Sequence, residues 1–146
     1  PLIDIPSPNY GPRLNRTVID MLVLHYTGML NAAAALDTLS NPDMEVSAHY
    51  LIDEDGKTYR LVSEECHATP PRPPSWRGHS NVNDRQIGGD LAPPPPAFLY
   101  LPPTQTQMTS LIKLATFLLF LPPPLFSWRG RGVSTYSIPL EFSKYP

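Results

Sequence analysis

His25 is the first residue of the chain whose type and position could support chemistry. It stands at the end of an apolar run, Val18 to Leu24, that only Asp20 interrupts, and Gly28 follows shortly after it. Such a run is typical of a buried strand, and a histidine at the end of a buried strand is held rigidly where ligands usually bind. A neutral imidazole on a stiff support suits a zinc ion. A hydrogen-bonded core histidine is the alternative interpretation.

The elements that must position His25 follow from the residue pattern along the chain. The predicted elements are a strand over 18–26, a helix over 31–39, strands over 46–53 and 58–62, a short strand over 87–91 and a helix over 104–121. Asn31 is the expected N-cap of the first helix. The Asp55-Gly56 pair predicts an antiparallel hairpin between the second and third strands. Strands and helices in alternation predict an α/β fold with a mixed central β-sheet flanked by helices.

Length and composition indicate one domain and exclude some classes of protein. The chain has 146 residues, which is long enough for a buried core. Its formal net charge of -2 gives no basic surface of the kind that binds nucleic acid. We expect a single domain over 1–146 with an extended, proline-containing arm over 1–17. The apolar run 114–121 is too short to span a membrane. The oligomeric state stays open, and the lone Cys66 says little about compartment.

The motifs of the first half of the chain resemble those of one known family. They are His25-Tyr26-Thr27-Gly28, Val46 to Asp53, Asp55-Gly56, Tyr59 to Val62 and Glu64-Glu65. Together they resemble the zinc-dependent N-acetylmuramoyl-L-alanine amidases, the type-2 amidase fold that peptidoglycan recognition proteins share. The resemblance covers about residues 6 to 120 and continues more patchily after Glu65 through Ser75 to Gly78 and Ile87-Gly88.

The resemblance implies a cofactor, a reaction and a place of action. In the family one Zn²⁺ is held by two histidines and one acidic residue, and it lowers the pKa of a bound water. A carboxylate acts as general base on that water. The bond cleaved joins N-acetylmuramic acid to the L-Ala of the stem peptide. The expected partner is therefore peptidoglycan or a muropeptide, and the expected location is the bacterial cell envelope, either periplasmic or secreted.

Three residues match the positions of the family's metal and catalytic groups. His25 matches the first zinc ligand, and Asp90 matches the general base, which in the family is a glutamate one methylene longer. Glu141 follows at about the spacing of the acidic ligand. Solvated carboxylates are the alternative interpretation for Asp90 and Glu141. Arg131 stands where the second histidine is expected, and a protonated guanidinium cannot bind zinc.

Three further residues are predicted to contact the substrate. Trp76 and Arg77 could line a glycan or peptide groove, although a loop tryptophan is as often a packing anchor. His49, in the second predicted strand, could line the same cleft or point at the sheet. Two other histidines lie in segments that resemble family motifs. His79 lies in a Gly-His-Ser segment that resembles a ligand motif, which the family carries elsewhere, after the long helix. His67 lies near a cleft segment of the family.

The second half of the chain departs from the family pattern, and 15 of the 20 prolines lie after residue 69. One explanation is a variant that has lost zinc and hydrolysis and retains only peptidoglycan binding. The other is a frameshift or misassigned residues after about residue 66, because runs such as 93–96 remove successive backbone donors. A catalytically inactive muropeptide-binding module is therefore the alternative function. A scaffold presenting polyproline helices is a third hypothesis.

Overall fold

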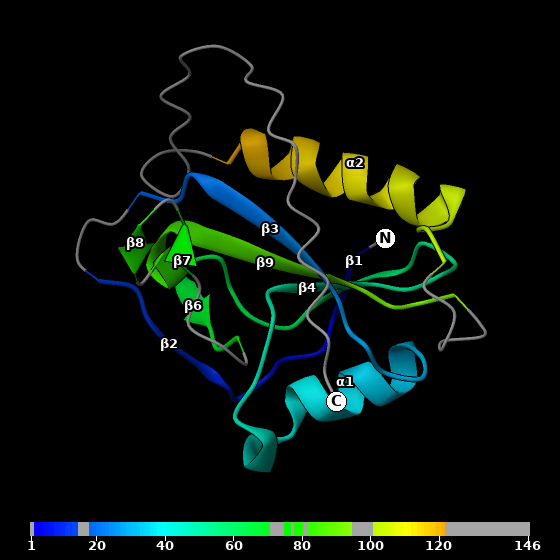
Figure 1. Cartoon of the computed structure of the whole chain (residues 1–146), viewed down its shortest axis with the longest axis horizontal. Helices are drawn as coiled ribbons and strands as arrows, with labels where there is room; N and C mark the ends of the chain where they lie inside the picture. The colour runs from blue at the N-terminus through cyan, green and yellow to red at the C-terminus, as the bar shows by residue number, and fades with distance from the viewer. Residues whose placement is uncertain are drawn as a thin grey trace.

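A mixed five-stranded sheet forms the centre of the computed structural model, which describes residues 2–14, 18–70, 75–76, 78–80, 82–94 and 101–121 (Figure 1). Its strands, in sheet order, are β1 (Leu2–Asp4), β5 (Thr58–Arg60), β4 (Tyr50–Ile52), β9 (Gln86–Leu91) and β3 (Met21–Tyr26). Only β4 and β5 pair antiparallel; β1 with β5, β4 with β9 and β9 with β3 are parallel. The predicted mixed sheet is confirmed.

One helix covers each face of this sheet. Helix α1 (Ala32–Ser40) and helix α2 (Gln105–Leu119) lie on opposite sides of the strands in Figure 1. The core under α2 is formed by Ile19, Leu24, Tyr50, Ile52, Ile87, Leu91, Leu111, Leu114 and Leu118. The core under α1 is formed by Ala32, Ala35, Leu39, Leu51, Leu61, Val62, Ala68 and Ala92. The central strands are thus buried on both faces, as parallel strands usually are.

Local sequence chemistry explains where these helices begin and how the hairpin turns. The Asn31 side chain accepts a hydrogen bond from the Ala34 N–H at 2.9 Å, which makes Asn31 the N-cap that the sequence predicts. Thr104 and Gln107 form a reciprocal capping box at the start of α2. In the turn between β4 and β5, Gly56 has φ 84°, a left-handed conformation that glycine adopts without strain.

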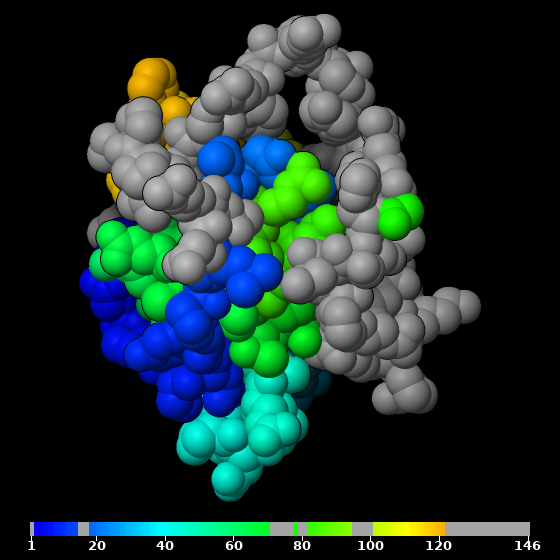
Figure 2. All heavy atoms as spheres, turned by 90° about the vertical axis from the view of Figure 1, so that its left-hand side faces the viewer, coloured from blue at the N-terminus to red at the C-terminus, as the bar shows by residue number. Residues whose placement is uncertain are grey.

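The N-terminal arm is extended and contributes strands to two sheets. Strand β1 lies at the edge of the central sheet, and β2 (Tyr10–Pro12) pairs antiparallel with β6 (Cys66–Ala68). Figure 2 shows the blue residues of the arm lying against the green residues of the middle of the chain. Sequence patterns did not predict these three strands, because three residues are too few to show a periodicity.

Short elements complete the described part of the chain. They are the 3₁₀ helices η1 (Pro42–Met44) and η2 (Val82–Arg85) and a hairpin of β7 (Ser75–Trp76) and β8 (His79–Ser80). None of the helices that the structure describes has the length and apolar character needed to cross a membrane. That residues 1–146 form one domain stays a prediction, since residues 122–146 lie outside the described ranges.

Candidate active site

The candidate site is built where strands β3 and β9 run side by side. In their parallel register His25 of β3 is the direct partner of Asp90 of β9. Leu24 and Leu91 belong to the core under α2, so the residues that alternate with them, His25 and Asp90, face the side of α1. The sheet therefore brings together an imidazole and a carboxylate that lie far apart in the sequence.

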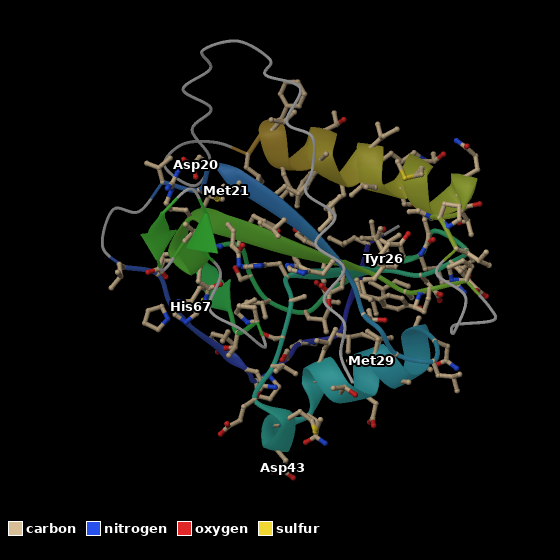
Figure 3. The ribbon with its side chains drawn as sticks, in the orientation of Figure 1. Asp20, Met21, Tyr26, Met29, Asp43 and His67 are labelled. Carbon is tan, nitrogen blue, oxygen red and sulfur yellow. The ribbon has the colours of Figure 1, made fainter. Side chains whose placement is uncertain are left out.

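A tight turn after β3 fixes the end of the strand that carries His25. The N–H of Thr27 donates to the Leu91 carbonyl at 3.1 Å, and the Thr27 Oγ1 accepts from the Met29 N–H at 3.2 Å. Gly28 between them has φ 65°, a left-handed conformation that glycine adopts without strain. Figure 3 shows Tyr26 and Met29 at the end of β3 opposite to Met21. The site therefore lies at the carboxyl end of β3.

The environment of Asp90 changes its acidity. Burial raises the pKa of Asp90 from 3.8 to about 7, because a charged carboxylate is disfavoured away from water. Its register partner on the other neighbouring strand is Leu51 of β4, which has no exposed surface. A carboxyl group with a pKa near neutrality exchanges protons readily at neutral pH, which suits a general acid or base.

His49 does not occupy the substrate-facing place that the sequence suggested. Its side chain is only 1% exposed. The imidazole Nδ1 accepts from the Gly88 N–H at 3.0 Å, and Nε2 donates to the Cys66 carbonyl at 2.8 Å. With both ring nitrogens engaged inside the protein, His49 cannot line a groove. The prediction of a substrate contact is wrong for this residue, whereas the alternative that it points at the sheet is right.

The other predicted residues are not gathered at the His25–Asp90 pair within the described part of the chain. Trp76 lies in β7, whose hairpin precedes the start of β9, and Figure 1 shows it at the far end of β3 from Tyr26. His79 is the register partner of Trp76 in the same hairpin. Arg77 and Glu141 lie outside the described residues, so their roles stay predictions.

A half-buried arginine, which the sequence did not single out, anchors the start of β9. Arg13 of the N-terminal arm donates to the Glu64 carbonyl at 2.9 Å, the Asp84 carbonyl at 2.8 Å and the Gln86 carbonyl at 3.0 Å. Burial lowers its pKa to about 10, which still leaves the guanidinium charged at neutral pH. An arginine within a stretch of prolines carries no sequence pattern that reveals such a role, because its partners are backbone carbonyls from distant segments.

His67 contacts the N-terminal arm and a neighbouring carboxylate. Its Nδ1 lies 2.9 Å from the Asp84 carboxylate oxygen, and its imidazole packs against Gly11 of β2. A Cβ atom on Gly11 would lie 2.5 Å from the His67 Nε2, so only glycine fits there while the ring keeps its position. His67 therefore joins the arm to β6 and is not placed at the strand ends with His25.

The described residues do not by themselves complete a zinc site. Catalytic zinc usually has three protein ligands and one open position. No group of three or more His, Cys, Asp or Glu side chains that could hold a metal ion exists among the residues that the structure describes. His25 offers one imidazole and Asp90 one carboxylate, which is one ligand short even if both were used.

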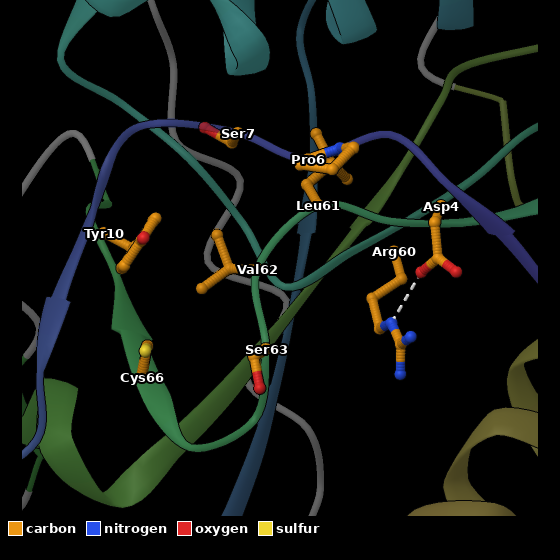
Figure 4. Close-up of a pocket in the computed structure, with 9 residues that line it drawn as sticks. All are labelled: Asp4, Pro6, Ser7, Tyr10, Arg60, Leu61, Val62, Ser63 and Cys66. Carbon is orange, nitrogen blue, oxygen red and sulfur yellow. Dashed lines mark hydrogen bonds and ion pairs between the residues drawn. The ribbon is translucent and has the colours of Figure 1, made fainter.

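A separate pocket of about 440 Å³ lies between the N-terminal arm and the segment from β5 to β6 (Figure 4). An ion pair between Asp4 and Arg60, 2.8 Å apart, closes one end of it. Its lining residues are Asp4, Pro6, Ser7, Tyr10, Arg60, Leu61, Val62, Ser63 and Cys66. Strands β5 and β4 separate this edge of the sheet from β9 and β3, so the pocket is distinct from the candidate site.

The fold and the site together define the class of protein. The described part of the chain combines a mixed sheet, covered by a helix on each face, with a histidine paired with a carboxylate at the strand ends. The family model described as N-acetylmuramoyl-L-alanine amidase matches residues 15–120. The chain belongs to this family, which confirms the predicted class of enzyme. No curated protein sequence matches the chain.

Several solved structures are similar to this chain in fold. A selenomethionine derivative of AmpD superposes with a TM-score of 0.68 at 24% identity, covering 81% of this chain and 73% of that one. AmiD from E. coli, in complex with anhydro-N-acetylmuramic acid-L-Ala-D-gamma-Glu-L-Lys, has 28% identity and a TM-score of 0.57, with coverages of 79% and 46%. AMPDH3 from Pseudomonas aeruginosa, in complex with an anhydromuramic pentapeptide, has 26% identity and a TM-score of 0.58, with coverages of 79% and 48%. The chain spans about half the length of the last two.

Proposed function

We propose that this chain hydrolyses the amide between N-acetylmuramic acid and the L-Ala of a stem peptide, with Asp90 as the general base. The observation that carries the proposal is the in-register pairing of His25 with Asp90 in a member of the amidase family. AmiD and AMPDH3 have been crystallised with anhydromuramyl peptides, so muropeptides of this kind are the substrates to test first. Action on the cell wall in the bacterial envelope, periplasmic or secreted, is the location that this substrate favours.

The proposed step uses the carboxylate of Asp90. As a base, the Asp90 carboxylate takes a proton from a water molecule while the water oxygen bonds to the carbonyl carbon of the amide. Breaking the C–N bond then releases the amine of L-Ala, which receives the proton from the Asp90 carboxyl group. The pKa of about 7 allows Asp90 to hold and return that proton near neutral pH.

Substituting Asp90 tests this role. Asp90→Asn removes the proton acceptor but keeps nearly the same shape, and we expect kcat to fall by about a hundredfold or more. Asp90→Glu is the matched control, because it keeps a carboxylate and installs the residue type that the family has there. We expect it to keep activity at or above the parent level. Release of L-Ala peptides from an anhydromuramyl peptide, followed by chromatography, gives the rates. An Asn variant as active as the parent would exclude Asp90 as the base.

We further propose that His25 is a ligand of Zn²⁺ and that Glu141 supplies the acidic ligand. Support comes from the family assignment and from the position of His25 at the rigid end of β3. Metal analysis of the purified full chain tests it: His25→Ala should lower bound zinc at least tenfold, and Glu141→Gln should lower it as well. Asp37→Asn, an exposed change on α1, is the control and should leave the zinc content unchanged. Equal zinc in all variants would contradict the ligand assignment.

A metal-free muropeptide-binding module is the second candidate function. It is favoured by the lack of a three-ligand group among the described residues and by Arg131, which cannot replace a histidine ligand. This alternative predicts binding of a muropeptide in isothermal titration calorimetry that is equally strong with and without a chelator. It also predicts no release of L-Ala peptides. Hydrolysis that a chelator abolishes would reject it in favour of the amidase.

A further inference from the structure

Strand β9 has an unusual sequence just before Asp90. Two successive glycines, Gly88 and Gly89, precede it in the middle of the central sheet. At Gly89 a Cβ would lie 3.2 Å from the Leu24 Cδ2, so the Leu24 side chain would have to move by a few tenths of an ångström to admit it. Glycine loses more conformational freedom on folding than other residues and offers no side chain to hold a strand in place. Backbone hydrogen bonds therefore hold this part of β9: the ladder with β3 runs along the whole strand, whereas the ladder with β4 starts only at Gly89.

His49 provides an anchor at Gly88. The ladder between β4 and β9 begins at the pair Tyr50–Gly89, so Gly88 lies just outside it. The His49 N–H donates to the Gly88 carbonyl at 3.0 Å, and the Gly88 N–H donates to the His49 Nδ1 at 3.0 Å. One residue thus binds both backbone groups of Gly88, and the imidazole takes the place that a strand carbonyl would have.

The His49 ring is itself held from its other side. Because Nδ1 accepts from Gly88, the proton of the neutral ring is on Nε2, which donates to the Cys66 carbonyl at 2.8 Å. The Arg13 Nη2 also lies 3.1 Å from Nε2, but it donates to the Gln86 carbonyl at 3.0 Å. The His49 carbonyl accepts from the Leu61 N–H at 2.8 Å. The ring is 1% exposed, so no water competes for these bonds. His49 therefore ties β9 to β6 and to the segment after β5.

We propose that His49 is a positioning residue, which holds β9 at Gly88 and thereby fixes Asp90 against His25. The inference rests on the proposed function, because a fixed Asp90 matters for catalysis only if Asp90 is the base. Holding a catalytic group in its productive geometry is a large part of catalysis, and a displacement of about 1 Å can cost about a hundredfold in rate. His49 acts through the backbone of β9 and does not contact the substrate.

Two substitutions separate the two hydrogen bonds of the ring. In His49→Asn the side-chain oxygen can take the place of Nδ1 and accept from Gly88. In His49→Gln the amide nitrogen can take the place of Nε2 and donate to Cys66, but no acceptor remains opposite Gly88. Amide hydrogen exchange at Gly88 and Asp90, followed by NMR, reports the anchor directly. Steady-state kinetics on an anhydromuramyl peptide report its consequence for kcat and KM.

We expect His49→Gln to speed exchange at Gly88 on the order of tenfold and to lower kcat by about tenfold or more, with KM changed less than about twofold. His49→Asn, which keeps the acceptor opposite Gly88, should keep both the slow exchange at Gly88 and most of the kcat of the parent. Equal exchange at Gly88 in the two variants, or an unchanged kcat in His49→Gln despite fast exchange, would overturn the proposal.

Two observations keep the test informative if a variant unfolds or if the parent is inactive. The ¹⁵N spectrum of the parent imidazole should show the Nε2–H tautomer with Nδ1 as a hydrogen-bond acceptor, and an Nδ1–H tautomer would overturn the anchor without any substitution. A parent that releases no L-Ala peptide would reject the proposed function. The exchange and ¹⁵N results would still decide whether His49 anchors β9.

Discussion

At the scale of single residues, two histidines on either side of β9 have opposite roles. His25 stands half-buried at the end of β3 beside a carboxylate, whereas His49 is closed inside the protein with both nitrogens bonded. Residue type alone does not distinguish them, because each histidine lies in a segment that the sequence predicts to be a strand. What separates them is the register of β9, which places Asp90 next to His25 and Gly88 next to His49. Chemistry at this site is therefore assigned by sheet pairing.

His49 predicts a loss of stability in mild acid. Burial lowers its pKa from 6.5 to about 4, the hydrogen bond to the Cys66 carbonyl opposes this, and the charges of Arg13 and His67 add to the lowering. The unfolded chain thus takes up the proton at a higher pH than the folded one. The stabilisation is complete above about pH 6.5 and is lost as the pH falls towards about 4, by about 3 kcal/mol in all.

Urea unfolding of the parent and of His49→Asn across this pH window measures the effect. The carboxyl groups of the chain contribute equally to both proteins, so the difference between the two curves isolates the imidazole. We expect the difference to shrink steadily as the pH falls, since only the parent must pay the cost of protonating a buried ring. Parallel curves for the two proteins would show that His49 is not buried in its neutral form.

At the scale of elements, a buried polar side chain adds hydrogen bonds to the apolar packing of α2 against the sheet. The Gln107 Nε2 donates to the Ala92 carbonyl at 2.6 Å and to the Ile52 carbonyl at 3.3 Å, and its side chain is fully buried. Its Oε1 also accepts from the Thr104 N–H at 3.0 Å in the capping box. Gln107 therefore both begins the helix and joins it to the ends of β4 and β9.

Replacing this glutamine tests the connection. Gln107→Met keeps a long, flexible side chain but leaves the Ala92 carbonyl without this donor, and we expect the free energy of unfolding to fall by about 2 kcal/mol. Gln105→Met, an exposed change two residues earlier on the same helix, is the control and should change stability by less than about 0.5 kcal/mol. Equal effects of the two substitutions in urea unfolding would contradict the role of Gln107.

The sequence predicted the elements with strong local chemistry and missed those that depend on distant partners. Both helices and the hairpin were predicted because Asn31, the Asp55-Gly56 pair and the apolar spacing of 104–121 act locally. Strands β1, β2 and β6 exist only through pairing with segments far along the chain, and no local pattern marks them. The same reasoning applies to the site. The family resemblance predicted His25 and Asp90, but the burial of the His49 ring depends on its bonds to Gly88 and Cys66, which lie far along the chain.

At the scale of the whole molecule, the sheet runs from an edge strand at the N-terminus to the strand that carries His25. Strand β1 covers β5, pairing Leu2 with Thr58 and Asp4 with Arg60, and the chain continues with a bond from the Ile5 N–H to the Arg60 carbonyl at 3.0 Å. The candidate site and the pocket beside Arg60 thus lie at different places in the same sheet. Changes to the N-terminal edge should affect stability more than chemistry.

Deleting residues 1–5 tests the role of the arm as an edge cover. The backbone groups of β5 that now pair with β1 would become exposed, and exposed strand edges pair readily with other chains. We expect a lower unfolding midpoint and a molar mass that rises with concentration in size-exclusion chromatography with light scattering. Leu2→Lys, which changes an exposed side chain but keeps the backbone pairing, should stay like the parent. A truncated chain that matches the parent in both measurements would show that β1 is dispensable.

The parallel pairing of β3 with β9 also governs the order in which the molecule can assemble. Met21 pairs with Gln86 and Tyr26 with Leu91, so the strand bearing His25 leaves the ribosome long before its partner is made. Closing so long a loop costs chain entropy before any contact compensates for it, and folds dominated by distant contacts fold slowly. During synthesis the apolar β3 segment therefore stays without its β9 neighbour until residues 86–91 have been made.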